Sequence, residues 1–546
     1  MCNSDCQTVY LFSVLQCCRV VFRIFKEHFV KVVYRVFELN RVANTMKRKH
    51  NSTYNESLSH KKKCKINVDH SLLTIGYDCL AMIITYLDTY NWIQFSYTCT
   101  FVNQLKYNAW LMKRKRKTSR FDIETLDELC DLLSKAKGTL FNVKFGACHK
   151  LLIDDSVFQY LQGTIHSLDM SHCKKVTDEA FKYLQGTIRR LNMSGCGLCT
   201  NAALSYLQDT IHTLLIGNGV YVTGITDEGL MYLKGTIRTL EITGCKYVTA
   251  QGLCHVNDTL DTLTKYRMTD DYFQQIPDSL HTLLIPYSKT ISLSLLKLAH
   301  HIRILDIAYC VPVTDEDLSL FTNLHSLNVS GCEQLTDEAF ANHKGTIRKL
   351  SINSCERLTA KTLSYLQGSI HTLIMPYCPQ FKDDDLVYLQ GSIHTLDISG
   401  CRQLSDKSFS YLQGTIRSLR MYNCYQASIT DEAFKYLTGT IRELDVKCCK
   451  QLSDKAISYL QGTIESLCIR SCPNITDQSL VFLKGTIQHL DIRGCSQISE
   501  QSLGILMDTL RSFYTSDQSS KYYRQANRNQ FYSDRYRQSM FQKQFN

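Results

Sequence analysis

Near-identical segments of about 23 residues recur between residues 141 and 510, and they restrict the fold to a stack of similar units. The segments GTIHSLDMSHC (163–173) and GSIHTLDISGC (391–401) show the pattern, which ends at a marker cysteine. Three further segments carry Gly219, Met268 or Ser288 at the marker place, which brings the number of units to sixteen. The marker cysteines are Cys148, Cys173, Cys196, Cys245, Cys310, Cys332, Cys355, Cys378, Cys401, Cys424, Cys449, Cys472 and Cys495.

One unit predicts a strand, a turn, a helix and a second turn. Leu168 and Met170 alternate with polar neighbours, as in a short strand with one buried face. Cys173 is small and buries readily, and its thiol can donate a weak hydrogen bond to a backbone carbonyl. Thr177 is a good helix N-cap, and Gly186 stands where a helix ends in the left-handed conformation. Because one unit cannot bury its own apolar face, the units must stack into an α/β solenoid.

The stack is expected to curve. Strands stack at about 4.8 Å per step and helices need more room, so the strands should lie on the concave side. Fifteen steps at this spacing give an inner arc of roughly 70 Å. An arc of this length spans a folded domain, which predicts a macromolecular partner on the concave face.

The candidate partner-binding residues stand at the outward positions of the predicted strands. The middle units hold apolar and aromatic residues there: Leu284, Pro286, Tyr287, Ile304, Tyr309, Ile374, Pro376 and Tyr377. The C-terminal units hold Arg420, Tyr422, Lys447, Arg470 and Arg493. Lone acids in the same positions are Asp169, Asp306, Asp397, Asp445 and Asp491, of which the last two either meet a partner or pair with neighbouring arginines. Exposed aromatic clusters usually mark a partner, so we predict one that buries apolar residues mid-array and offers acids to the C-terminal units.

The repeat resembles the cysteine-containing subclass of leucine-rich repeats. The matching features are the L-x-L-x-x-C core and the (V/L/I)-(T/S)-D that follows it, and they cover about two-thirds of the chain. The resemblance implies a leucine-rich-repeat horseshoe.

Residues 71–117 read as a compact helical module that resembles an F-box. The matching positions are Ile75-Gly76 at the opening, Asp78 as the acid, Leu80, Ile83 and Ile84 as the apolar core, and the pair Tyr86-Leu87. Gly76 departs from the family pattern, which has proline there. By resemblance, Ile75, Asp78, Leu80, Ile83, Ile84, Tyr86 and Leu87 would bind an adaptor. The alternative interpretation is a helical cap on the first repeat, although a helix within residues 118–140 already fits that role.

An F-box followed by cysteine-containing repeats is the layout of one class of ubiquitin-ligase substrate receptors. The resemblance implies an SCF-type adaptor–cullin complex as one partner and a protein substrate on the solenoid as the other. The rival interpretation is a leucine-rich-repeat interaction scaffold without a ligase. A more remote interpretation is an RNA-binding protein that uses its basic ends.

The two ends of the chain differ from the repeats in charge. The net charge of +11 arises from residues 1–120, with 20 Lys+Arg against 7 Asp+Glu, and from residues 511–546, with 7 against 2; residues 121–510 carry 35 against 42. Nucleic acid is therefore not the expected partner of the repeats. Residues 1–70 are expected to be a basic, partly disordered extension, and residues 511–546 a disordered tail. Residues 9–38 form either an ordinary helix, which we favour, or a basic amphipathic helix at a membrane surface. The cysteine usage favours the cytosol or nucleus.

No signature of catalysis, cofactor binding or metal binding stands out, so the chain is not expected to be an enzyme. Cys196 and Cys199 have the spacing of a zinc-binding pair, but Cys196 is a marker cysteine, which favours core packing. Asp383, Asp384 and Asp385 open a repeat helix, where they complement its dipole.

Overall fold

The computed structural model describes residues 126–135, 142–145, 153–163, 165–217, 222–288, 299–423, 428–499 and 501–515. The predicted N-terminal extension, the F-box-like module and most of the predicted tail lie outside these residues. No helix in the described part of the chain is both long and apolar enough to cross a membrane.

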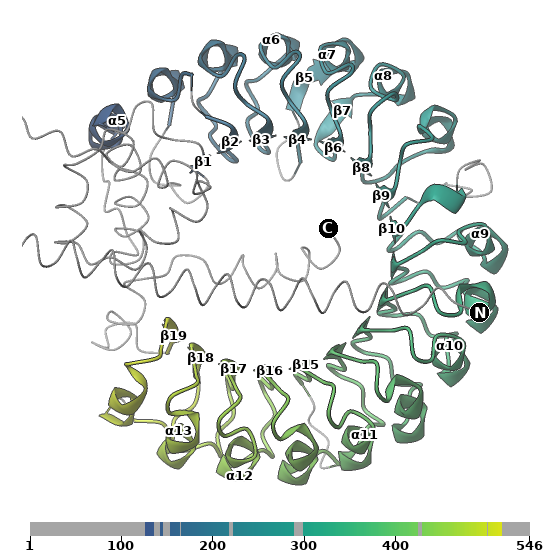
Figure 1. Cartoon of the computed structure of the whole chain (residues 1–546), viewed down its shortest axis with the longest axis vertical. Coiled ribbons are helices and arrows are strands. Elements are labelled where there is room, and N and C mark those ends of the chain that lie inside the picture. The colour runs from purple at the N-terminus through teal and green to yellow at the C-terminus, as the bar shows by residue number, and fades with distance from the viewer. Residues whose placement is uncertain are drawn as a thin grey trace, which may run out of the picture. The chain divides into compact units, whose positions relative to one another are not determined.

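A parallel sheet of 17 strands runs through the repeats, with each strand paired to the strand of the next repeat. Figure 1 shows these strands on the inner side of the arc and the helices on its outer side. The sheet has one strand more than the repeat pattern predicts, because the last strand follows residue 510. Its strands are β1 (Asn142–Lys144), β2 (Ser167–Asp169), β3 (Arg190–Asn192), β4 (Thr213–Leu215), β6 (Thr239–Glu241), β8 (Thr262–Thr264), β9 (Thr282–Leu284), β10 (Ile304–Asp306), β11 (Ser326–Asn328), β12 (Lys349–Ser351), β13 (Thr372–Ile374), β14 (Thr395–Asp397), β15 (Ser418–Arg420), β16 (Glu443–Asp445), β17 (Ser466–Cys468), β18 (His489–Asp491) and β19 (Ser512–Tyr514).

The outer elements are shorter and tighter than the predicted helices. Many are 3₁₀ segments of about two turns, labelled η, because each starts at its N-cap and must end soon after at a left-handed residue such as Gly186. They are α5 (Leu126–Lys135), η2 (Asp155–Tyr160), η3 (Asp178–Tyr183), α6 (Asn201–Ser205), α7 (Asp227–Met231), α8 (Ala250–Leu253), η4 (Asp270–Gln275), η6 (Ala299–His301), α9 (Asp315–Ser319), η7 (Asp337–His343), α10 (Ala360–Tyr365), η8 (Asp383–Leu389), α11 (Asp406–Ser410), η9 (Asp431–Leu437), α12 (Asp454–Ser458), α13 (Asp477–Leu483) and η10 (Gln501–Leu506). A separate parallel pair joins β5 (Val222–Thr226) to β7 (Cys245–Tyr247).

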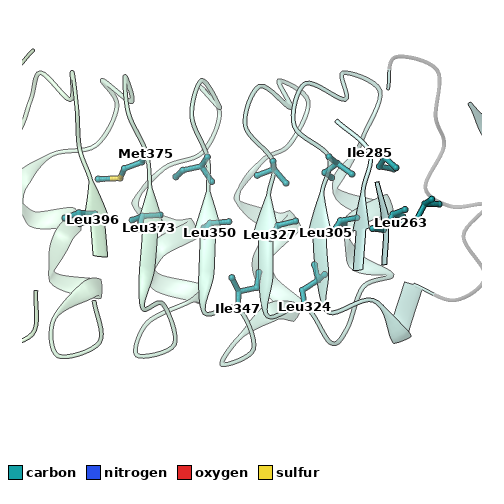
Figure 2. Packing of buried hydrophobic residues seen from close by; sticks show 14 of the residues in the cluster. Leu263, Ile285, Leu305, Leu324, Leu327, Ile347, Leu350, Leu373, Met375 and Leu396 are labelled. Carbon is teal, nitrogen blue, oxygen red and sulfur yellow. The ribbon is translucent and has the colours of Figure 1, made fainter. Parts of the chain in front are cut away.

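The core is a set of parallel rows of side chains, one from each repeat. In Figure 2 the central strand leucines, among them Leu305, Leu327 and Leu350, form one row. Met375 and Ile285 lie in a second row, and Ile347 and Leu324 in a third. These side chains are completely or almost completely buried, which confirms that the repeats share one continuous core.

The marker cysteines of the described repeats lie inside this core, as predicted. The Cys401 thiol donates to the carbonyl of Met375 in the preceding repeat at 3.1 Å, and Cys495 donates to that of Ile469 at 2.9 Å. Cys196 and Cys199 are both buried and donate to the carbonyls of Met170 and Val176. Burial raises the pKa of Cys196 to about 12, so the thiol stays protonated.

A carboxylate bridge joins the starts of consecutive outer elements. Asp178 accepts the backbone N–H and the hydroxyl of Thr200, each at 2.7 Å, and Asp406 does the same with Thr430. Asp383 binds Ser405 in this way, so its role is a bridge between repeats and not only the predicted complement to a helix dipole. Each bridge fixes the N-cap of the next repeat in space.

Two core positions in the described repeats carry basic side chains. Lys265 stands where most other repeats have Met, Ile or Val, and it is 8% exposed with its ammonium 4.9 Å from the Tyr272 ring centroid. His343 takes the place of a buried leucine such as Leu366 or Leu389 and is completely buried. Burial lowers the pKa of both groups.

Candidate functional site

Three tyrosines stand out on the turns that follow the inner strands. Tyr287, Tyr309 and Tyr377 are 46%, 38% and 49% exposed. The prediction placed them within strands, but they lie beyond the strand ends, directly before the marker position. There they adopt the left-handed conformation, with φ of 62°, 59° and 57°. A bulky residue in this region is conformationally strained.

The same turn position accommodates glycine elsewhere in the array. Gly195, Gly331, Gly400 and Gly494 occupy it with positive φ. The backbone holds the conformation because the N–H at this position donates to a carbonyl of the next repeat, at 2.6 Å from Tyr309 to Ser330. The left-handed geometry suits glycine, although His172, Arg267, Ser354, Asn423, Cys448 and Ser471 also adopt it at this position. The three tyrosines present their rings outward on this fixed backbone.

The tyrosine rings contact one another along the array. Tyr287 and Tyr309 stack in parallel, with ring centroids 5.0 Å apart and planes 5° apart. Tyr266, which is 38% exposed, extends the row with its centroid 6.1 Å from that of Tyr287. The sequence interpretation missed Tyr266, which alignment on Met268 would have placed two residues before the marker. Residues Tyr266, Tyr287 and Tyr309 are called the tyrosine row below.

A second aromatic cluster lies three repeats further on. Tyr377 meets Tyr422 edge to face at 6.2 Å, and the Lys447 ammonium lies 4.2 Å from the centroid of Tyr422. The Tyr377 ring also covers Gly400, where a Cβ would lie 2.7 Å from the ring Cε1. Glycine at 400 therefore makes room for the exposed ring.

The predicted apolar positions beside the tyrosines are less available than expected. Pro286, Ile374 and Pro376 are buried, whereas Leu284 and Ile304 are half-buried. Pro286, Ile374 and Pro376, which were predicted to face a partner, therefore offer it little surface. The aromatic rings, and not the aliphatic side chains, supply the exposed apolar surface.

The predicted column acids have a structural role. Asp169, Asp306, Asp397, Asp445 and Asp491 each accept the backbone N–H two residues further along the chain, at 3.0–3.3 Å. Each carboxylate therefore closes the turn that ends its strand. Burial raises the pKa of Asp306 and of Asp397.

The C-terminal basic residues are largely neutralised within the chain. Arg493 makes two hydrogen bonds to Asp491, at 2.9 and 2.7 Å, and Lys447 lies 3.9 Å from Asp445. Asp491 therefore pairs with an arginine, as one of the two sequence interpretations predicted. Asp445 pairs with a lysine in place of the expected arginine. Arg420 is half-buried in strand β15, and Arg470 is exposed. The predicted attraction of an acidic partner to these residues is thereby weakened.

The predicted adaptor-binding residues Ile75 to Leu87 lie outside the described residues. The described surface offers stacked phenol rings on turns whose backbone is hydrogen-bonded to the next repeat. Such a surface suits the binding of another macromolecule.

Comparisons with known proteins agree with the repeat architecture. A model of the leucine-rich-repeat family matches residues 322–339, which span strand β11 and the start of η7. No curated protein matches the sequence. The complex of Rad7 and Elc1 in yeast is a similar solved structure, with 17% identity, a TM-score of 0.40 and coverage of 69% of this chain and 85% of that chain. The TLR13–ssRNA13 complex is similar at 15% identity and a TM-score of 0.41, over 69% of this chain and 56% of that chain. With their parallel inner strands, leucine core and outer helical turns, the units described above are leucine-rich repeats.

Proposed function

We propose that this chain is a protein-binding substrate receptor of a cullin-type, SCF-like ubiquitin ligase. In this proposal the F-box-like residues 71–117 dock the adaptor, and the inner face of the repeats holds the protein to be ubiquitylated. The observation that carries the binding role is the tyrosine row, in which Tyr287 and Tyr309 keep a strained left-handed backbone and remain exposed. Strain that persists in a well-packed structure often serves function.

The tyrosine row has the properties of a binding hot spot. Its rings are large, lose little conformational entropy on binding and are already ordered by stacking. The turn backbone beneath them is fixed to the next repeat, so a partner would meet a preorganised surface. We infer that the partner inserts apolar or proline-containing segments against these rings.

The ligase role rests on the resemblance of residues 71–117 to an F-box and on the order of the two parts in the chain. A binding solenoid that follows an adaptor-docking module would bring a captured protein to the ligase. If no adaptor binds, the same solenoid remains an interaction scaffold, which is the second candidate function.

The first test is binding of the full chain to a purified adaptor–cullin complex, followed by size-exclusion chromatography. We expect co-elution of the full chain, and loss of co-elution on Leu87→Asp. The matched control is Tyr287→Ala with Tyr309→Ala, which should retain the adaptor. Failure of the unmodified chain to bind would contradict the ligase role, whatever the Leu87 variant does.

The second test addresses the substrate surface separately. Proteins that co-purify with the full chain are added to a reconstituted ubiquitylation reaction. Tyr287→Ala with Tyr309→Ala should reduce their modification at least about tenfold, since hot-spot truncations commonly cost more than 1 kcal/mol each. Equal modification with this variant would contradict substrate binding at the tyrosine row.

A further inference from the structure

A column of basic residues borders the inner sheet at the start of its strands. The residue directly before each strand from β2 onward is arginine or histidine in thirteen of sixteen repeats. The arginines are Arg189, Arg238, Arg303, Arg348, Arg417, Arg442 and Arg511. The histidines are His166, His212, His281, His325, His371 and His394, and the exceptions are Asp261, Glu465 and Gln488. These residues are called the Arg/His column.

The backbone holds the column in a continuous line. The carbonyl of each column residue accepts the N–H of the next, without a break from His166 to Arg511, at 2.7–2.9 Å. Side chains that would be scattered on an ordinary surface therefore follow one another at the strand spacing of about 4.8 Å.

Except for Arg442, which lies 3.9 Å from Glu465, the column arginines have no ion pair among the residues that the structure describes. Elsewhere the pairs Lys447–Asp445 and Arg493–Asp491 are formed on the inner face, and Lys407 pairs with Asp384 on the outer side. Arg303, Arg348 and Arg417 are exposed, and among the residues that the structure describes none of them has an ion-pair partner. The net charge of residues 121–510 is mildly negative, but exposed arginines gather at one edge of the inner sheet.

The stretch from Arg303 to Arg442 contains seven consecutive column positions and no acid. Six steps at about 4.8 Å make it roughly 29 Å long. It carries four arginines, which stand two, three and one strand apart, or about 10, 14 and 5 Å, with histidines at the positions between them.

The distances between the arginines, and the aspartates near them, indicate the kind of partner. An extended polypeptide repeats the side chains of one face about every 6.7 Å, so its acidic side chains can meet arginines that stand about 5 to 14 Å apart. Duplex nucleic acid carries a charge about every 1.7 Å. Such a dense and wide polyanion would also meet Asp306, Asp397 and Asp445, which lie three residues further along their strands, or about 10 Å away. We propose that the Arg/His column between Arg303 and Arg442 binds an extended acidic segment of a protein. This site is distinct from the tyrosine row, and it does not depend on adaptor docking.

The test uses the full chain and a fluorescein-labelled peptide of about ten residues with glutamate at alternate positions. Fluorescence anisotropy should show binding that weakens as salt is raised. Arg348→Glu with Arg417→Glu should weaken it at least about tenfold, because like charges then face the peptide.

The matched control is Arg402→Glu with Lys450→Glu, two exposed cations that follow marker cysteines at the opposite end of the strands. This control makes the same change in net charge and should leave peptide binding within about twofold of the unmodified chain. Equal weakening by both double variants would show attraction by total charge alone and overturn the proposal. Absence of peptide binding, or tighter and equally Arg348-dependent binding of a thymidine oligonucleotide, would also overturn it. Circular dichroism shows that each variant is folded.

Discussion

The Asp383 carboxylate accepts hydrogen bonds from both the backbone N–H and the hydroxyl of Ser405, at 2.7 and 2.6 Å. Ser405 is the N-cap of the next outer helix, so one side chain sets the position where the following repeat starts its helix. The Ser408 hydroxyl binds the same carboxylate.

We expect Asp383→Ala to lower the free energy of unfolding by roughly 2–3 kcal/mol, because it removes these bonds and leaves a helix N-cap without its support. Urea denaturation followed by circular dichroism measures the change. The neighbouring Asp384→Ala is the control, since Asp384 is exposed and binds only Lys407 and Tyr411 at the surface. Comparable losses of stability in the two variants would show that the bridge between repeats contributes no more than a surface ion pair does.

Tyrosine at the left-handed turn is predicted to be present for binding and not for stability. Tyr309→Gly relieves the strained φ but loses the stack on Tyr287, whereas Tyr309→Ala loses the stack and keeps the strain. The glycine variant should therefore be more stable than the alanine variant by about 1 kcal/mol. Thermal unfolding of both proteins checks the order, and an alanine variant at least as stable as the glycine variant would contradict it.

The buried thiols predict a loss of stability in alkali. Burial raises the pKa of Cys196, Cys310 and Cys472 to about 12, above the value near 9 of an exposed thiol. The folded state therefore binds more protons than the unfolded state between these values, so the stabilisation is complete below about pH 9 and is lost as the pH rises toward 12. Urea midpoints measured at about pH 8 and pH 10.5 should fall across this window.

Alkylation provides an independent check on the same thiols. Near pH 8, iodoacetamide should leave Cys196, Cys310 and Cys472 unmodified in the native chain and modify them in urea. Peptide mass spectrometry identifies the sites. The half-buried Cys254 and Cys448 serve as internal controls that react more readily in the native state, and early modification of the marker cysteines would count against their burial.

The buried side chain of His343 predicts that the folded chain loses stability in acid. Burial lowers its pKa from the usual 6.5, so the folded state disfavours the charged imidazole. The corresponding stability is present above about pH 6.5 and is lost as the pH falls through the lowered value. His343→Leu restores the residue type found at Leu366 and Leu389, and it should raise the urea midpoint more at about pH 5 than at about pH 7.5. A gain independent of pH would contradict this assignment.

The repeat itself was predictable because its chemistry is local and repeated. Leu168, Cys173 and Thr177 occupy the strand, core and N-cap positions that their residue types favour, and the parallel sheet follows from stacking. Elements as short as η3 were not predicted to be 3₁₀ turns, because the difference depends on how tightly the neighbouring repeats confine each turn.

The partner-binding surface was predicted less well, for a physical reason. Period-two alternation identifies outward residues only while the chain remains a strand, and here each strand ends after three residues. Pro286 and Tyr287 lie past that end, so the turn geometry buries one and exposes the other. The carboxylate bridges were missed as well, since a bond from Asp383 to Ser405 joins residues 22 apart.

Two joints of the array have alanine in place of the bridging aspartate, at Ala250 and at Ala360. The N-cap that follows Ala360 is Lys382, which has no hydroxyl to bind an aspartate. From Asp383 onward the bridges continue without interruption through the pair Asp477–Ser499. Under a pulling force or in denaturant, the repeats from Asp383 to Ser499 are therefore expected to unfold as one cooperative block, with its N-terminal boundary at Ala360.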